Sequence, residues 1–166
     1  MNEKEILERI KFHEGLRLMP YRDHLGKLTI GIGRCIETHP FSQKELSFCG
    51  DWQHGITPTA AYQLCRNDIQ ECQSQLNTLG LWYHNLDDNR KYALLDMCFQ
   101  LGFKGLCNFK KMLKHLQNKD WQGAYYECLD SKYAKKDTPT RAKRIAIALK
   151  TGRWYYDLNE YNKEVV

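Results

Sequence analysis

The 166-residue sequence has no hydrophobic run near the roughly 20 residues that a membrane-spanning helix needs. Its first residues, MNEKEILERI, alternate charged and apolar side chains and do not form the apolar segment of a signal peptide. Internal repeats and low-complexity linkers are also absent, which disfavours repeat architectures. We therefore expect a soluble product that accumulates in the cytoplasm in which it is made.

Metal-ligand and cofactor motifs are missing as well. The seven cysteines form no C-x-x-C pair, and the six histidines show no H-E-x-x-H spacing. The G-I-G at 31–33 lacks the third glycine and the helix start of a dinucleotide-binding loop. Several cysteines occupy apolar helical positions, so we expect reduced core thiols, no metal and no cofactor. A disulfide framework is the alternative.

The chain has enough apolar material to fold, because 42% of its residues are hydrophobic and 12% are aromatic. This suits one domain or two small lobes that share a core. The net charge of +5 is unevenly placed, since residues 131–153 contain eight Lys and Arg and one Asp. Such a segment suggests a polyanionic partner, which could be a cell-wall polymer, an anionic lipid or a nucleic acid. A solvated helix face is the alternative.

The N-terminal pattern predicts a helix over residues 2–14. Asn2 with Glu5 three residues later resembles a capping box, and Gly15 is placed to end the helix. Glu14 then lies in the last turn, where the negative end of the helix dipole favours the protonated carboxyl. This position suits Glu14 to donating a proton.

Residues 16–36 predict a small antiparallel sheet, with short β-prone runs interrupted by Pro20, the Asp23-His24 turn and Gly26. The remainder predicts helices over residues 42–49, 58–79, 91–101, 109–117, 121–129 and 141–150. Ser42 with Glu45 resembles a second capping box, and Thr57-Pro58 and Thr138-Pro139 each resemble an N-cap followed by a proline at the first helical position. The 58–79 helix would span about 30 Å, long enough to connect two lobes.

Two carboxylates and a hydroxyl occur at fixed spacing in the first part of the chain: Glu14, Asp23 and Thr29. Glycoside hydrolysis needs an acid for the leaving oxygen and a second carboxylate across the sugar, about 6.5–9.5 Å away in inverting enzymes and about 5–5.5 Å away in retaining ones. Thr29 could hold the attacking water, because a hydroxyl both donates and accepts. The alternative makes Glu14 a surface acid, Asp23 a turn former and Thr29 a strand residue.

Several motifs occur along the chain in a recognisable order: HEGLRL, YRD, TIGIG, GIT, MCFQLG, DTPTRAKR and TGRW. Together they resemble the phage-type lysozymes, the endolysin muramidases of glycoside hydrolase family 24. The resemblance implies a two-lobed α+β fold. A sheet lobe would cover about 14–57, a connecting helix 58–79, and a helical lobe 80–166 on which helix 2–14 packs.

The same resemblance implies hydrolysis of the β-1,4 bond between N-acetylmuramic acid and N-acetylglucosamine in peptidoglycan by an inverting mechanism. Glu14 would be the acid, Asp23 the base, and Thr29 would position the water. Phe99 and Gln100 would form the cleft wall, and Arg141 would face Glu14. Without the resemblance, Phe99 is an apolar helix residue and Arg141 a helix-start cation. Arg141 would favour the charged form of Glu14, opposing the helix dipole.

The sequence departs from the family at several positions. Arg34 replaces a histidine, and Asp68 on the long helix occupies the partner position, so we expect an ion pair between them. His13, Tyr133 and Met112 also differ from the family pattern, and the segment between residues 36 and 56 is shorter. These changes affect the predicted sugar contacts more than the acid and base.

Two other functions remain open. A lytic transglycosylase would need one acid, and the presence of Asp23 and Thr29 disfavours it. A non-catalytic module would bind cell wall or another polyanion through the basic segment. For the lysozyme we expect peptidoglycan strands as partner, no nucleic acid, a monomer, and access to the wall from the host bacterial cytoplasm after the inner membrane is permeabilised. The basic helix at 141–153 could also bind an anionic outer membrane through an apolar face of Ala142, Ile145, Ala146 and Leu149.

Overall fold

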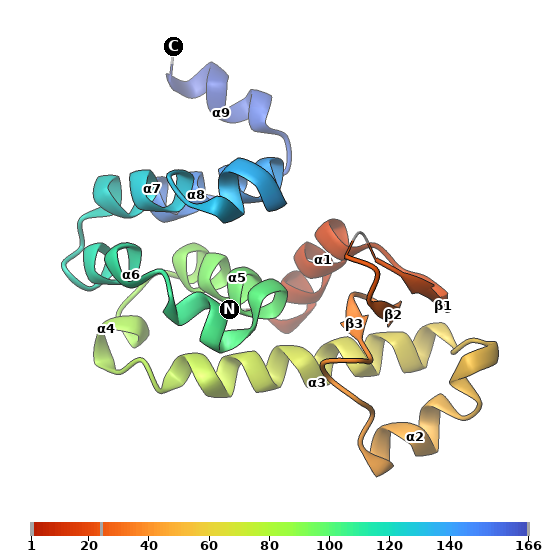
Figure 1. Cartoon of the computed structure of the whole chain (residues 1–166). Helices are drawn as coiled ribbons and strands as arrows, with labels where there is room; N and C mark the ends of the chain where they lie inside the picture. Colours follow the sequence, from red (N-terminus) through yellow and green to blue (C-terminus); the bar gives the residue numbers. More distant parts are fainter. Residues whose placement is uncertain (1, 24, 166) are drawn as a thin grey trace. The chain divides into compact units, whose positions relative to one another are not determined.

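The computed structural model describes residues 2–23 and 25–165, except for the side chain of residue 165. The chain divides into two compact units, Met1–Glu71 and Cys72–Val166. The division falls inside the helix that the sequence assigns as the connection. The predicted α+β class is confirmed, because the described residues form many helices and one small antiparallel sheet (Figure 1). Packing of residues 2–14 on the helical lobe stays a prediction.

The first unit begins with helix α1 (Glu3–Glu14), whose bounds follow from its caps. The Asn2 side chain accepts a hydrogen bond from the Lys4 amide at 2.9 Å, so Asn2 is the N-cap as predicted. At the other end the Gly15 amide donates to the Lys11 carbonyl at 2.8 Å. Glu14 is therefore the last residue of the helix.

Three antiparallel strands follow in the order β1-β2-β3: β1 (Arg17–Arg22), β2 (Leu28–Gly31) and β3 (Arg34–Cys35). The expectation that Pro20 interrupts a strand is wrong, because Pro20 lies within β1. β1 is an edge strand, and its pairing with β2 shifts register between Arg17 and Tyr21. A proline without an amide hydrogen is tolerated at such a place. His24 lies outside the described residues.

Helices α2 (Gln43–Cys49) and α3 (Pro58–Asn77) begin where local capping predicts. Ser42 and Glu45 form a complete capping box, and the Thr57 hydroxyl accepts from the Ala60 amide at 3.1 Å. A 3₁₀ turn, η1 (Trp52–His54), lies between the two helices. The core of this unit joins the sheet to both helices through buried residues: Ile30, Cys49, Ile56, Ala60, Ala61 and Leu64.

The second unit is helical, and the structure adds elements that the sequence did not predict. Its elements are α4 (Leu81–His84), α5 (Asp88–Cys107), α6 (Lys110–Gln117), α7 (Trp121–Leu129), a π-turn η2 (Tyr133–Asp137), α8 (Pro139–Thr151) and α9 (Leu158–Val165). Helix α5 breaks at Gly102, where its end was predicted, and then resumes for one turn. Helices α4 and α9 and the π-turn were missed.

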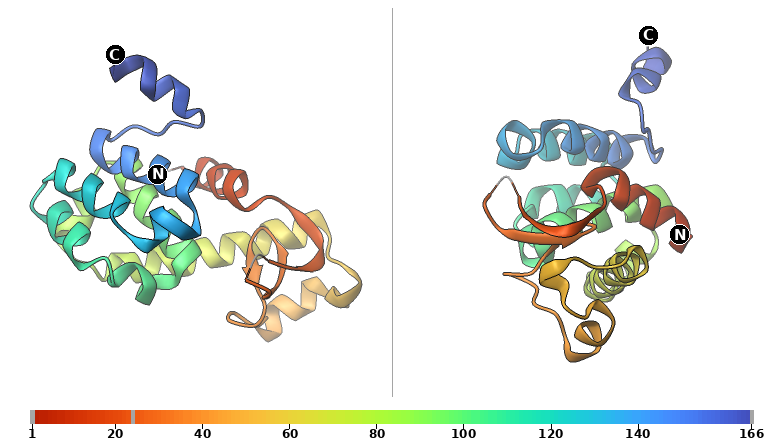
Figure 2. Two further views of the ribbon diagram at one scale, coloured as in Figure 1. Left: turned by 45° about the horizontal axis from the view of Figure 1, so that its top comes forward. Right: turned by 90° about the vertical axis from the view of Figure 1, so that its right-hand side faces the viewer.

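Helix α8 is central to the second unit. It packs against α5 and α7, and Figure 2 shows α7 and α8 running side by side. Thr138 is its N-cap residue, as predicted, but its hydroxyl makes no capping hydrogen bond.

Among the described residues, no helix is both long and apolar enough to cross a membrane. Five of the seven cysteines are buried, which agrees with the expected core positions, and their reduced state stays a prediction.

Candidate active site

Glu14 is held at the end of α1 by close packing on a glycine. A Cβ atom built on Gly33 would lie 2.8 Å from Glu14 Oε2 and 2.9 Å from its carboxyl carbon. The backbone of Gly33 also has a φ of +76°, a conformation that favours glycine. The Glu14 carboxyl therefore rests directly on the turn between β2 and β3, where only glycine leaves room for it.

Asp23 lies at the turn that follows β1. Its Oδ1 accepts hydrogen bonds from the Leu25 amide at 2.8 Å and the Lys27 amide at 2.9 Å. Its own amide donates to the Lys27 carbonyl at 3.0 Å. The turn-forming role is therefore real, and both side-chain bonds fall on one oxygen. These two bonds fix the orientation of the carboxylate, and neither of them involves Oδ2.

Thr29 is buried in β2, with 3% of its surface exposed. Its hydroxyl donates to the Lys27 carbonyl at 3.2 Å, which leaves the oxygen lone pairs as acceptors. Across the sheet Thr29 pairs with Tyr21 of β1. The hydroxyl is thus anchored to the same turn that orients Asp23.

Tyr21 connects the three predicted residues. Burial raises the pKa of Tyr21, the negative charge of Glu14 adds to the rise, Arg17 opposes it, and Asp23 adds a smaller rise. The phenol is therefore within electrostatic range of both carboxylates, while its backbone pairs with Thr29. The first unit carries two carboxyls and a hydroxyl at the end of α1, in the turn after β1 and in β2, and these are the kinds of group that acid–base catalysis uses.

Sequence comparison identifies the fold that carries this arrangement. The Phage lysozyme family model matches residues 11–145 of the chain. The chain belongs to the phage lysozyme family. The match includes Glu14, Asp23 and Thr29, and it extends through the helices of the second unit to the middle of α8.

Curated relatives agree with the family. "Probable T4-type lysozyme 2" of Dictyostelium discoideum is 31% identical over 157 residues, covering 86% of this chain and 92% of that protein. "Probable T4-type lysozyme 1" of the same organism is 30% identical, with 89% and 94% covered. The central spike protein Gp5 of Enterobacteria phage T4 is 30% identical over 95% of this chain and 29% of that protein. The protein is a lysozyme, a glycoside hydrolase.

The lysozyme's second unit contains the other predicted site residues. Phe99 and Gln100 are adjacent in α5 and half-buried. The Gln100 amide nitrogen donates to the Thr138 hydroxyl at 3.4 Å. The predicted role of Phe99 and Gln100 in sugar binding stays a prediction.

Arg141 has a carboxylate partner within its own unit that the sequence did not reveal. Its Nε donates to Asp96 Oδ1 at 2.6 Å, and Asp96 is completely buried in α5. The Tyr92 hydroxyl donates to the other Asp96 oxygen at 3.0 Å. The Arg141 guanidinium is therefore engaged by Asp96, and the predicted pairing of Arg141 with Glu14 stays a prediction.

The departures from the family pattern have different structural settings. Met112 is 1% exposed in α6, so it belongs to the core of the second unit and is no surface sugar contact. Tyr133 is 3% exposed, and burial raises its pKa. Its ring packs edge-to-face on Phe109 with centroids 6.0 Å apart. The His13 ring lies 5.4 Å from that of Phe12.

The predicted Arg34–Asp68 ion pair is confirmed, and it is larger than predicted. The Arg34 Nε lies 2.9 Å from one Asp68 oxygen, and Nη2 lies 2.5 Å from the other. Nη2 also donates to Glu45 Oε1 at 2.7 Å, and Asn67 donates to the same oxygen at 2.9 Å. Arg34 is 1% exposed. One guanidinium therefore joins β3, α2 and α3 inside the first unit.

The charges of this network compensate for their burial. Burial disfavours the charged guanidinium, but hydrogen bonds to Glu45 and Asp68 outweigh it, so the pKa of Arg34 is raised. Burial also disfavours the Glu45 carboxylate, yet hydrogen bonds from Arg34, Asn67 and Ser42 lower its pKa from 4.5 to about 2. For Asp68, burial outweighs the hydrogen bond and the positive charge of Arg34, so the pKa of this carboxyl is raised. Glu45 is thus the carboxylate that the network stabilises most clearly.

The basic helix of the lysozyme presents charge without a free apolar face. The predicted apolar face consists of residues that are fully buried in the second unit: Ala142, Ile145, Ala146 and Leu149. This supports core packing for these side chains. Contact with an anionic membrane through residues 141–153 stays a prediction.

Among residues 2–23 and 25–165, no group of three His, Cys, Asp or Glu side chains is placed to hold a metal ion.

Four residues of these networks were missed from the sequence. Glu45 was assigned only its capping role, and Tyr21 carried no distinctive pattern. Gly33 was considered only as part of the G-I-G sequence, and its contact with Glu14 was not predicted. Asp96 had a usable signal, because a single acid within the apolar run YALLDMCF is buried only when it is paired.

Proposed function

We propose that the protein hydrolyses the β-1,4 bond between N-acetylmuramic acid and N-acetylglucosamine in bacterial peptidoglycan, with inversion at the anomeric carbon. Glu14 protonates the leaving oxygen, and Asp23 removes a proton from the attacking water. Thr29 holds that water through its acceptor lone pairs. The observation that carries the proposal is that the Glu14 carboxyl packs against Gly33 just after β2, while Asp23 and Thr29 both bond to Lys27 just before the same strand.

The local structure supports this division of roles. Glu14 is the last residue of α1, and its carboxyl group packs against Gly33. Asp23 accepts two amide hydrogen bonds on Oδ1, which fix the orientation of its carboxyl group. Inversion requires about 6.5–9.5 Å between the two carboxyls, with a water between them.

The decisive experiment is digestion of purified peptidoglycan followed by mass spectrometry of the new ends. Hydrolysis yields reducing muramic acid ends, and inversion makes the α-anomer the first product in a fresh NMR spectrum. Glu14→Gln and Asp23→Asn should each lose about 10²–10⁴-fold in rate. Glu8→Gln, an exposed acid on the same helix, is the matched control and should keep full activity.

The alternatives give different results in the same assay. A lytic transglycosylase would produce anhydro ends and would retain activity in Asp23→Asn. A non-catalytic wall-binding module would produce no new ends. Full activity in Glu14→Gln would exclude the assigned acid. Accumulation in a host bacterial cytoplasm and a monomeric state remain predictions, which cell fractionation and light scattering would test.

A further inference from the structure

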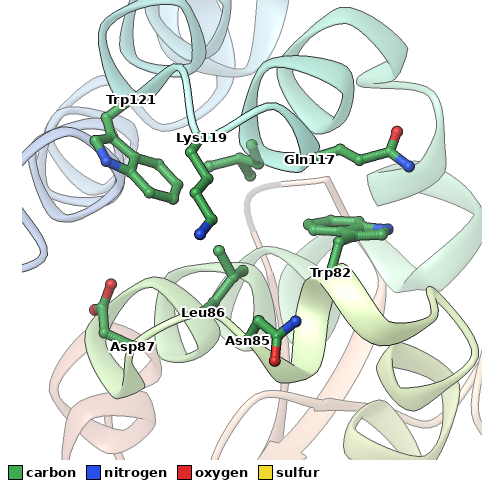
Figure 3. Close-up of a pocket in the computed structure, with 8 residues that line it drawn as sticks. Trp82, Asn85, Leu86, Asp87, Gln117, Lys119 and Trp121 are labelled. Atoms are coloured by element: carbon green, nitrogen blue, oxygen red, sulfur yellow. The ribbon is translucent and has the colours of Figure 1, made fainter.

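The second unit contains a pocket of about 450 Å³ that is formed by side chains from α4, the turn after it, the end of α6 and the start of α7. Two half-buried tryptophans, Trp82 and Trp121, line it together with the polar residues Asn85, Gln117 and Lys119 (Figure 3). This volume is in the range of about 300–1,000 Å³ that is usual for small-molecule sites. None of these residues takes part in the proposed hydrolysis.

Lys119 reaches this pocket from an unfavourable backbone conformation. Its φ is 57°, and it is the single non-glycine residue with positive φ in the described part of the chain. Lysine at such a position costs free energy that glycine or asparagine would largely avoid. Figure 3 shows its side chain extending between the two indoles toward Leu86. A strained residue that directs an ammonium group into a pocket suggests a role in ligand binding.

The walls of the pocket are fixed by a buried arginine behind them. The Arg90 guanidinium lies 3.9 Å from the centre of the Trp121 ring and donates to Asp87 Oδ2 at 2.5 Å. It also donates to the carbonyls of Leu149 and Lys150 at 2.8 and 2.9 Å. Arg90 covers one face of the indole, so another face or edge of Trp121 meets the pocket. Trp121 and Asp87 are therefore oriented by α5 and α8 before any ligand binds.

We propose that this pocket binds one N-acetylhexosamine unit of a glycan strand, separately from the catalytic residues. Flat indole faces stack on the C–H groups of a pyranose ring, while ring hydroxyls and the acetamido group need both donors and acceptors. Asn85 and Gln117 supply both, Lys119 donates, and Asp87 accepts. The side-chain amides of Asn85 and Gln117 are neutral and the Asp87 charge is already paired with Arg90, which suits an uncharged sugar. The inference rests on the proposed action on peptidoglycan.

The test uses the full-length Glu14→Gln protein, so that the glycan is not cleaved. Its four tryptophans give four indole N–H signals in NMR, which single substitutions assign. Titration with tri-N-acetylchitotriose in the millimolar range should shift the Trp82 and Trp121 signals along one binding curve. Unmoved signals for both indoles would overturn the proposal.

Variants locate the binding. Trp82→Ala should weaken the affinity for tri-N-acetylchitotriose, measured from the Trp121 signal, about tenfold. Leu81→Ala, on the neighbouring and 81% exposed residue, is the matched control and should leave it unchanged. Lys119→Gly should bind more weakly while unfolding at the same or a higher temperature, because glycine relieves the positive φ. Unchanged affinity in both Trp82→Ala and Lys119→Gly would refute the site.

Activity measurements separate this inference from the proposed function. With intact Glu14, Trp82→Ala should raise KM on insoluble peptidoglycan and leave kcat unchanged. If Glu14-dependent hydrolysis is present but Trp82→Ala has the KM of the Leu81→Ala control, the pocket proposal fails alone. If hydrolysis does not depend on Glu14, the proposed function fails, and the NMR titration still decides whether the pocket binds sugar.

Discussion

Removing the Arg34 guanidinium should destabilise the lysozyme more than removing any surface cation. Arg34→Met leaves Glu45 and Asp68 buried without their shared counter-charge, and loss of one partner of a buried ion pair costs about 3–5 kcal/mol. In a chain of this length that loss lowers the melting temperature by about 8–15 °C. Arg22→Met is the matched control, because Arg22 pairs with Glu37 at 2.9 Å on the surface and should cost less than about 1 kcal/mol.

The size of this loss should depend on pH in a defined direction. Glu45 has a pKa lowered from 4.5 to about 2, which corresponds to about 3 kcal/mol of stability that exists above pH 4.5 and disappears as the pH falls toward 2. Arg34→Met removes the hydrogen bonds that lower this pKa, and burial beside Asp68 then raises it. The variant therefore becomes more stable as the pH falls from 7 to 4, and its deficit relative to wild type shrinks.

Urea denaturation followed by circular dichroism at pH 7, 5.5 and 4 measures these differences. A loss below about 1 kcal/mol at pH 7, or an equal loss at all three pH values, would contradict the assigned network. Adding Asp68→Ala to Arg34→Ala should recover part of the stability, since one unpaired carboxylate is then removed. Strictly additive losses would show that the two residues are not coupled.

Two further predictions follow from packing and burial. Gly33→Ala places a Cβ 2.8 Å from Glu14 Oε2 and should reduce peptidoglycan hydrolysis by about 10²-fold. Gly50→Ala, at the end of α2, carries a similar positive-φ strain with nothing within 4 Å of the added Cβ, so it should unfold at a similarly lowered temperature with full activity; equal activities of the two variants would remove the proposed support of Glu14. Burial raises the pKa of the Cys65 and Cys128 thiols to about 12, so at pH 8 a disulfide reagent should label them only after unfolding. Rapid labelling of the native protein would contradict their burial.

The sequence was most informative where structure is decided by neighbouring residues. The caps at Asn2, Ser42 and Thr57 each satisfy backbone amides within four residues, so the helix starts could be predicted from local chemistry. Glu14 at the end of α1 and Thr29 in β2 followed from the same reasoning. Pro20 was misjudged because its tolerance depends on which strand lies at the sheet edge, a property of the assembled sheet.

Contacts between distant parts of the sequence were not predictable in the same way. Arg141 meets Asp96 across 45 residues, and no local pattern identifies that partner. Arg34 and Asp68 were paired only through the family resemblance, and Glu45 had already been assigned to a capping box. The support that Gly33 gives Glu14 depends on how α1 packs on the β2–β3 turn. Such features become visible only when the elements are placed together.

The shared guanidinium of Arg34 also constrains how this protein can evolve. A substitution at residue 34 leaves two buried carboxylates facing each other, and a substitution at residue 45 or 68 alone removes one of the partners that offset the burial of the cation. Each single change therefore passes through a destabilised intermediate, although a simultaneous replacement by apolar residues could be neutral. Positions 34, 45 and 68 should change together among descendants of this chain, and a lineage that has acquired the arginine will rarely lose it.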